Sequence, residues 1–179
     1  MKKYIIVVLS LLLYAPSPLA AQEISKKTLI VYYSQSGKNE LIAEHLGSKI
    51  ENSAVKKITL KEEISFGSLI FKHLVRSDLE IEEIDVKEYD TIIISTPIWL
   101  QILALPTKVF IESADFKGKE VYAFITCGGF YGFAESLEEW ISEQGAEVKG
   151  LFVIKVGGKP DEDIKKEISM HMKNAAVVK

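Results

Sequence analysis

The stretch that decides the fold reads Ile30-Val31-Tyr32-Tyr33-Ser34-Gln35-Ser36-Gly37-Lys38-Asn39. It begins inside an apolar run from Thr28 to Tyr33, which predicts a strand buried on both faces. After the glycine, apolar residues recur at helical spacing at Ile42, Leu46 and Ile50. A polar loop from Ser34 to Asn39 is therefore expected between a buried strand and a helix that begins near Asn39.

This loop has the chemistry of an anion site. A helix N-terminus presents unpaired N–H groups and a partial positive charge, so a phosphate monoester is a natural ligand there. The alternative is that Ser36 or Asn39 only caps the helix, since both residue types are preferred caps. A Walker A loop is excluded, because its first glycine would fall at Tyr32 and Lys38 is followed by Asn39 rather than Ser or Thr.

The rest of the chain repeats this alternation of short apolar runs and longer amphipathic stretches, without an internal repeat or a linker. Further strands are predicted at Ala54 to Leu60, Thr91 to Ser95, Val121 to Thr126 and Leu151 to Val156. The pattern favours one domain, residues 22–179, folded as a three-layer α/β/α sandwich around a five-stranded parallel sheet of order 2-1-3-4-5. Ligands of such sheets bind beyond the carboxyl ends of the strands, which directs attention to the loops there.

The second such loop, Ser95 to Leu100, follows the third strand, and Pro97 is expected to end that strand. Trp99 either stacks on a flat ligand or packs against the next helix. The third loop, Cys127-Gly128-Gly129-Phe130-Tyr131-Gly132, has glycines that allow close approach of the backbone to a ligand. Its glycines could equally form a plain turn, and Cys127 is interpreted as a small buried hydrophobic residue.

The stretch from Ile30 to Asn39, followed by Ala43 and Leu46, resembles the phosphate loop of the flavodoxin family. Pro97 and Trp99 are similar to that family's second loop, and Pro106, Phe110 and Ile111 are similar to the helix that follows it. The sequence departs from the family at Asn39, where Thr is usual, and at Gln101, where glycine is frequent. The resemblance implies a flavodoxin-like fold with bound FMN, and these cofactor-binding residues: Ser34, Gln35, Ser36, Gly37, Lys38, Asn39, Thr96, Pro97, Ile98, Trp99, Leu100, Cys127, Gly128, Gly129 and Tyr131.

The family further implies a carrier of electrons that meets a redox partner protein, whose identity the sequence does not specify. Two alternatives stay open. One is an FMN-dependent NAD(P)H oxidoreductase acting on a quinone or related acceptor, although no nicotinamide motif is present. The other is a flavin-free adaptor that keeps only the fold. No catalytic residue and no metal ligand is predicted.

The N-terminus carries the pattern of a secretory signal peptide over residues 1–21: two lysines, an apolar run from Tyr4 to Tyr14, then small residues. The run is shorter than the roughly 20 apolar residues of a membrane span, which argues against a retained anchor. We therefore expect an exported, periplasmic or extracellular protein with no stable membrane span in its mature chain.

Charge and cysteine content narrow the classes of partner. Cleavage after residue 21 would leave 20 basic against 25 acidic residues, a net charge of −5, which argues against nucleic acid as a partner. Cys127 is the only cysteine, so neither an intramolecular disulfide nor a multi-thiolate metal site can form. The three histidines, His45, His73 and His171, are expected to be solvated helix residues.

Overall fold

A computed structural model describes residues 26–75, 77–100, 102–128 and 134–175; for residues 134–136 it describes the backbone only. The predicted signal peptide and the predicted site residues Gly129 and Tyr131 lie outside these ranges. None of the described helices is long and apolar enough to cross a membrane.

Five parallel strands form the sheet, in the order β2-β1-β3-β5-β6. Counted along the chain without the short β4, this is the predicted order 2-1-3-4-5, so the fold prediction is confirmed. The strands are β1 (Thr28–Tyr32), β2 (Ser53–Lys57), β3 (Thr91–Trp99), β5 (Glu120–Cys127) and β6 (Glu147–Lys155). The extra strand β4 (Ile102–Leu103) pairs antiparallel with the end of β3.

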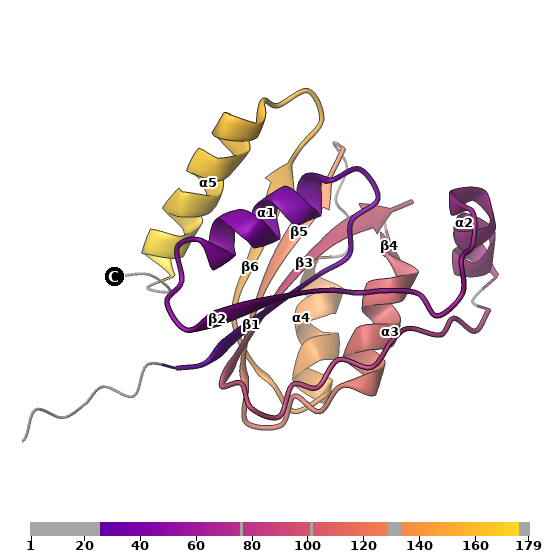
Figure 1. Ribbon diagram of the computed structural model, residues 1–179, viewed down its shortest axis with the longest axis horizontal. Helices are drawn as coiled ribbons and strands as arrows, with labels where there is room; N and C mark the ends of the chain where they lie inside the picture. The colour runs from indigo at the N-terminus through magenta and orange to yellow at the C-terminus, as the bar shows by residue number, and fades with distance from the viewer. Residues whose placement is uncertain (1–25, 76, 101, 129–133, 176–179) are drawn as a thin grey trace, which may run out of the picture.

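Helices cover both faces of this sheet (Figure 1). On one face lie α1 (Lys38–Gly47) and α5 (Asp161–Asn174), packed on Ile30, Ile93 and Phe124. On the other face lie α3 (Leu105–Ser113) and α4 (Ala134–Glu143), packed on the alternate strand residues such as Leu29, Val31 and Ile94. Because side chains alternate across a strand, burial of every residue of β1 requires both layers.

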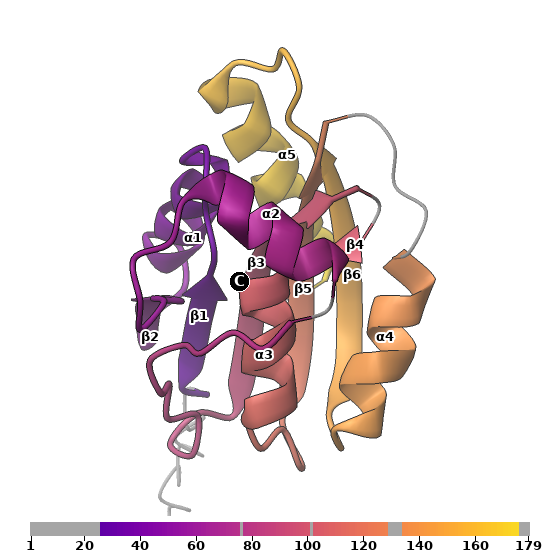
Figure 2. The ribbon, with the colours of Figure 1, turned by 90° about the vertical axis from the view of Figure 1, so that its right-hand side faces the viewer.

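The helix α2 (Phe66–Leu74) lies apart from these layers, beyond the carboxyl end of β3 and next to β4 (Figures 1 and 2). Only Leu69 and His73 of this helix are buried, whereas Phe71 and Leu74 are exposed. The helix is therefore positioned by a few side chains at the end of the sheet where ligands of this fold bind.

The prediction that Pro97 ends the third strand is wrong, because β3 continues through it to Trp99. Proline lacks the N–H that a central strand needs. However, β1 pairs with β3 only as far as Ser95, so Pro97 lies where β3 no longer has β1 as a neighbour. Its carbonyl accepts a hydrogen bond from the N–H of Ala104 at 3.2 Å, which closes the hairpin with β4.

Candidate functional site

The first and second predicted loops and the end of β5 meet at the carboxyl edge of the sheet. The N–H of Tyr33 donates to the carbonyl of Ser95 at 3.1 Å, which joins the first loop to β3. The Asn39 amide accepts from the hydroxyl of Ser95 at 3.0 Å and donates to that of Thr126 at 2.9 Å. Residues far apart in the chain therefore form one contiguous site, as the fold predicted.

The first loop presents an uncapped helix N-terminus. The N-cap of α1 is Gly37, in the left-handed region at φ 80°, and no side chain caps the helix. The alternative that Ser36 or Asn39 only caps the helix is therefore wrong. The first helical bond runs from the N–H of Leu41 to the carbonyl of Gly37, and within the described chain the backbone N–H groups of residues 34 to 40 have no acceptor.

These free N–H groups, together with one side chain, fit a phosphate monoester. The hydroxyl oxygen of Ser34 is buried and has no partner among the described residues. A buried polar group left unsatisfied costs stability, so an acceptor or donor supplied by a ligand at this point would be favourable. The next two residues, Gln35 and Ser36, are exposed and accessible to the same ligand.

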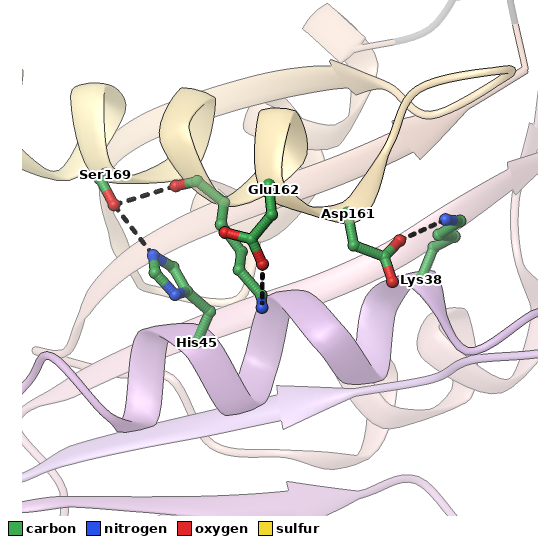
Figure 3. A network of polar contacts seen from close by, with 6 residues as sticks. Lys38, His45, Asp161, Glu162 and Ser169 are labelled. Atoms are coloured by element: carbon green, nitrogen blue, oxygen red, sulfur yellow. Dashed lines mark hydrogen bonds and ion pairs between the residues drawn. The ribbon is translucent and has the colours of Figure 1, made fainter.

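The loop's cation is already paired. The ammonium of Lys38 lies 2.6 Å from a carboxylate oxygen of Asp161, the first residue of α5 (Figure 3). Both line an open hollow of about 310 Å³ beside the loop, together with Glu40 and Glu44. With one ammonium facing three carboxylates, an anion in the first loop would depend mainly on main-chain N–H groups.

The acidic Glu40 has a partner of its own on β1. It accepts a hydrogen bond from the phenol of Tyr32 at 2.8 Å. Burial, aided by this bond and the nearby carboxylates, raises the pKa of Tyr32 to about 12. The phenol therefore stays a neutral donor to Glu40 at every physiological pH.

At the end of β3, Trp99 packs edge-to-face against three rings. Ring centroids lie 5.6 Å away for Tyr33, 5.4 Å for Phe66 and 5.9 Å for His73. Trp99 therefore packs against a helix, as one of the two alternatives held, but that helix is α2 rather than the next helix along the chain, α3. Sequence reasoning missed Phe66 and His73; with Leu69 they have the i, i+3, i+7 spacing of one helix face, which was the available signal.

His73 is buried, with 5% of its surface exposed, so its expected solvation is wrong. Its Nε2 has no partner among the described residues. Burial lowers the pKa of this imidazole; hydrogen bonding to the main chain of Trp99 works against that effect, and the charge of Lys108 adds to it. A neutral imidazole is accordingly favoured beside Trp99.

The remaining predicted residues of the second loop differ in accessibility. The hydroxyl of Thr96 is buried and lies 2.8 Å from that of Thr107 in the first turn of α3. This hydrogen bond joins β3 to the start of α3. Pro97 and Ile98 are partly buried. Leu100 is 62% exposed and has φ 48°, a left-handed conformation that favours glycine.

In the third loop, Cys127 is 3% exposed, as expected of a buried hydrophobic residue. The neighbouring Gly128 is exposed, and a Cβ on it would meet no atom within 4 Å. A Cβ on Gly157 would lie 2.9 Å from the carbonyl oxygen of Gly128, so glycine at 157 permits the two segments to pack closely. Sequence reasoning did not single out Gly157. No group of three or more His, Cys, Asp or Glu within the described ranges is placed to hold a metal ion.

Comparison with known proteins agrees with this arrangement. A family model described as Flavodoxin matches residues 27–144. A flavodoxin of Maridesulfovibrio salexigens is 29% identical over 148 residues, covering 76% of this chain and 90% of that protein.

Solved structures extend the comparison to the fold. A flavoprotein of Lactobacillus acidophilus, solved in complex with FMN, is 26% identical with a TM-score of 0.57, covering 80% of this chain and 99% of that one. Flavodoxin 1 of Bacillus cereus has a TM-score of 0.54 at 22% identity, covering 84% and 95% of the two chains, which supports the fold. Sheet order and connections define a doubly wound α/β protein with an uncapped helix N-terminus after its first strand. The chain belongs to the flavodoxin family.

Proposed function

We propose that this chain holds FMN non-covalently at the carboxyl ends of β1, β3 and β5 and carries electrons between partner proteins. The observation that carries the proposal is a row of N–H groups, from residue 34 to residue 40, that find no acceptor among the described residues, beside the hydroxyl of Ser34, which finds no partner there either. Membership of the flavodoxin family and the FMN-bound relative support FMN as the cofactor.

Each part of the site has a distinct task toward that cofactor. The first loop binds the phosphate through main-chain N–H groups and Ser34, where the partial charge of the α1 N-terminus favours a dianion. The end of β3, with Trp99, and the end of β5, with Cys127, border the space for the ring system. When bound, FMN supplies the electron chemistry, and the protein supplies binding, orientation and electrostatics.

The electron-carrying role gains support from the surface beside the site. Leu100 is 62% exposed and Ile102 is 47% exposed, and both lie in the hairpin formed by the end of β3 and β4. Transient redox partners meet through small interfaces, for which a short apolar hairpin beside the cofactor is suitable.

Flavin binding is tested by titrating the purified soluble domain with FMN and with riboflavin, the same ring system without phosphate. We expect saturable FMN binding, weaker binding of riboflavin, and a loss of FMN affinity in Ser34→Ala. The matched control is Ser48→Ala at the other end of α1, which should bind FMN as the wild type does. A protein that fails to bind micromolar FMN would instead be the flavin-free adaptor.

Electron transfer is tested by stepwise reduction of the FMN-loaded protein. A carrier should populate a one-electron-reduced flavin and oxidise NAD(P)H slowly when no other protein is present. A strict two-electron reduction with rapid NAD(P)H oxidation would overturn the carrier proposal in favour of the oxidoreductase.

We also propose export, supported by the signal-peptide pattern of residues 1–21. The test is fractionation of the native cells with mass analysis of the N-terminus. Cleavage near residue 21 in the extracytoplasmic fraction is expected, and an uncleaved cytoplasmic chain would refute the proposal.

A further inference from the structure

A single buried side chain joins the three segments that border the site. Asn39, the second residue of α1, is only 2% exposed. Its Oδ1 accepts from the hydroxyl of Ser95 on β3 at 3.0 Å, and its Nδ2 donates to the hydroxyl of Thr126 on β5 at 2.9 Å. Ser95 and Thr126 are themselves buried, at 0% and 3% exposure.

These three side chains depend on one another for their hydrogen bonds. A buried hydroxyl or amide without a partner is costly, so this set favours one relative position of the α1 N-terminus, β3 and β5. The hydroxyl of Ser95 lies a further 3.3 Å from the main-chain carbonyl of Asn39, which adds a second contact to the same turn. The side chain of Asn39 therefore points into the protein, while its backbone N–H has no acceptor in the part of the chain that the structure describes.

We propose that Asn39 is a positioning residue, which holds the α1 N-terminus against β3 and β5 so that the phosphate loop is formed before any ligand arrives. Its side chain does not contact the ligand. A site already in its binding conformation binds more tightly, because less ordering accompanies association. That the ligand is FMN rests on the proposed function. That the loop is formed before a ligand binds does not depend on the proposed function.

The residue type is suited to this task. An amide has a separate donor and acceptor at the end of a two-bond reach, so it can bridge two hydroxyls on different strands. The Thr that is usual at this position in the flavodoxin family has a single hydroxyl, carried on Cβ, in place of the separate donor and acceptor of the amide. A residue that bridges should therefore be replaceable by neither Ala nor Thr.

The experiment compares Asn39→Ala, Asn39→Thr, Thr126→Val and the double variant Asn39→Ala/Thr126→Val. Thr126→Val keeps the side-chain shape and removes only the hydroxyl. Two quantities are measured: the FMN dissociation constant and, in ligand-free protein, hydrogen exchange of the Leu41 amide, which makes the first helical bond of α1. Ser169→Ala is the control, since it removes a 2.9 Å contact with His45 between α1 and α5 away from the three segments (Figure 3).

We expect each single variant to weaken FMN binding about tenfold, equivalent to about 1.4 kcal/mol. The double variant should lose much less than the product of the two single losses, because both remove the same contact. Exchange of the Leu41 amide should quicken in each, while the Ser48 amide at the far end of α1 stays as in the wild type. Ser169→Ala should change neither FMN affinity nor Leu41 exchange.

Three results would overturn the proposal. Full FMN affinity in Asn39→Thr, with Thr126→Val also unchanged, would mean that the side chain contacts the phosphate directly. A lower melting temperature with unchanged affinity and unchanged Leu41 exchange would mean a role in stability alone. Multiplicative losses in the double variant would mean that the two residues act separately. If the wild type binds no FMN, the proposed function fails, but hydrogen exchange of the Leu41 amide still tests the positioning role. If Asn39→Ala does not fold, Thr126→Val takes its place in both measurements.

Discussion

Replacing Asp161 with Asn should tighten FMN binding, although Asp161 is not expected to touch the flavin. Asp161 holds the ammonium of Lys38, the cation of the proposed phosphate loop, at 2.6 Å (Figure 3). While this pair persists, the charge of Lys38 is unavailable to an anion in the loop. The Asp161→Asn variant releases the lysine and removes a negative charge from the neighbourhood of the phosphate.

The magnitude follows from the exposure of the two side chains, 31% for Lys38 and 55% for Asp161. Pairs this exposed contribute about 0.2–1 kcal/mol. Freeing Lys38 can therefore strengthen phosphate binding by up to about fivefold. Asp161 also lies in the first turn of α5, where a negative charge stabilises the helix, so the same variant should lower protein stability by about 0.3–1 kcal/mol. Affinity and stability should thus move in opposite directions.

The assay is a titration of ligand-free protein with FMN and with riboflavin at low salt. The matched control is Glu162→Gln, which removes the same charge one residue further along and breaks the contact with Lys165 on its own helix, leaving the pair of Lys38 with Asp161 in place. Tighter binding of FMN by Asp161→Asn, with riboflavin unchanged, is the expected outcome. An equal gain with Glu162→Gln, or no gain at all, would refute the reasoning that the pair with Lys38 competes with the ligand.

Three further outcomes concern stability. Leu100→Gly should raise the melting temperature by about 1–3 °C in calorimetry, because glycine adopts φ 48° without the roughly 1–2 kcal/mol cost of a left-handed side chain; Leu100→Ala, which keeps that cost, should not. Gly37→Ala should lower the melting temperature by about 2–4 °C. The cause is the left-handed backbone conformation alone, since a Cβ at this position meets no atom within 4 Å. For His73 the folded pKa lies below the usual 6.5, so its contribution to stability is present above pH 6.5 and is lost as the pH falls below it. Thermal melts between pH 7 and pH 5 should show a smaller decline in His73→Gln than in the wild type, and an unchanged decline would contradict the assignment.

Much of the fold could be predicted because its signals are local. Leu29 to Tyr32 are apolar at consecutive positions, and a strand with such a run needs a helical layer on each face, as β1 has. The end of β3 could not be predicted in this way. Pro97 is a local signal for ending a strand, but whether the missing N–H matters depends on the neighbouring strand, and β1 has already ended there.

The loops of the site were also visible in the sequence, whereas the contacts inside the site were not. The glycine and polar residues from Ser34 to Asn39 lie at a strand-to-helix junction, as predicted, and their binding of an anion stays a prediction. The partner of Asn39 is Thr126, 87 residues away, and that of Lys38 is Asp161, 123 residues away. No spacing rule links residues so distant. The direction of the Asn39 side chain, on which its role depends, therefore emerges only from tertiary structure.

The first turn of α1 divides its chemistry between side chains and main chain. Successive helical residues point about 100° apart, so three consecutive side chains can reach three different neighbours. Lys38 contacts α5, Asn39 bridges β3 and β5, and Glu40 accepts from Tyr32 on β1. Their backbone N–H groups, in contrast, all point along the helix axis toward the loop, and none has an acceptor in the described chain. The side chains hold the turn from three sides, which supports the proposal that the loop is already formed before a phosphate binds.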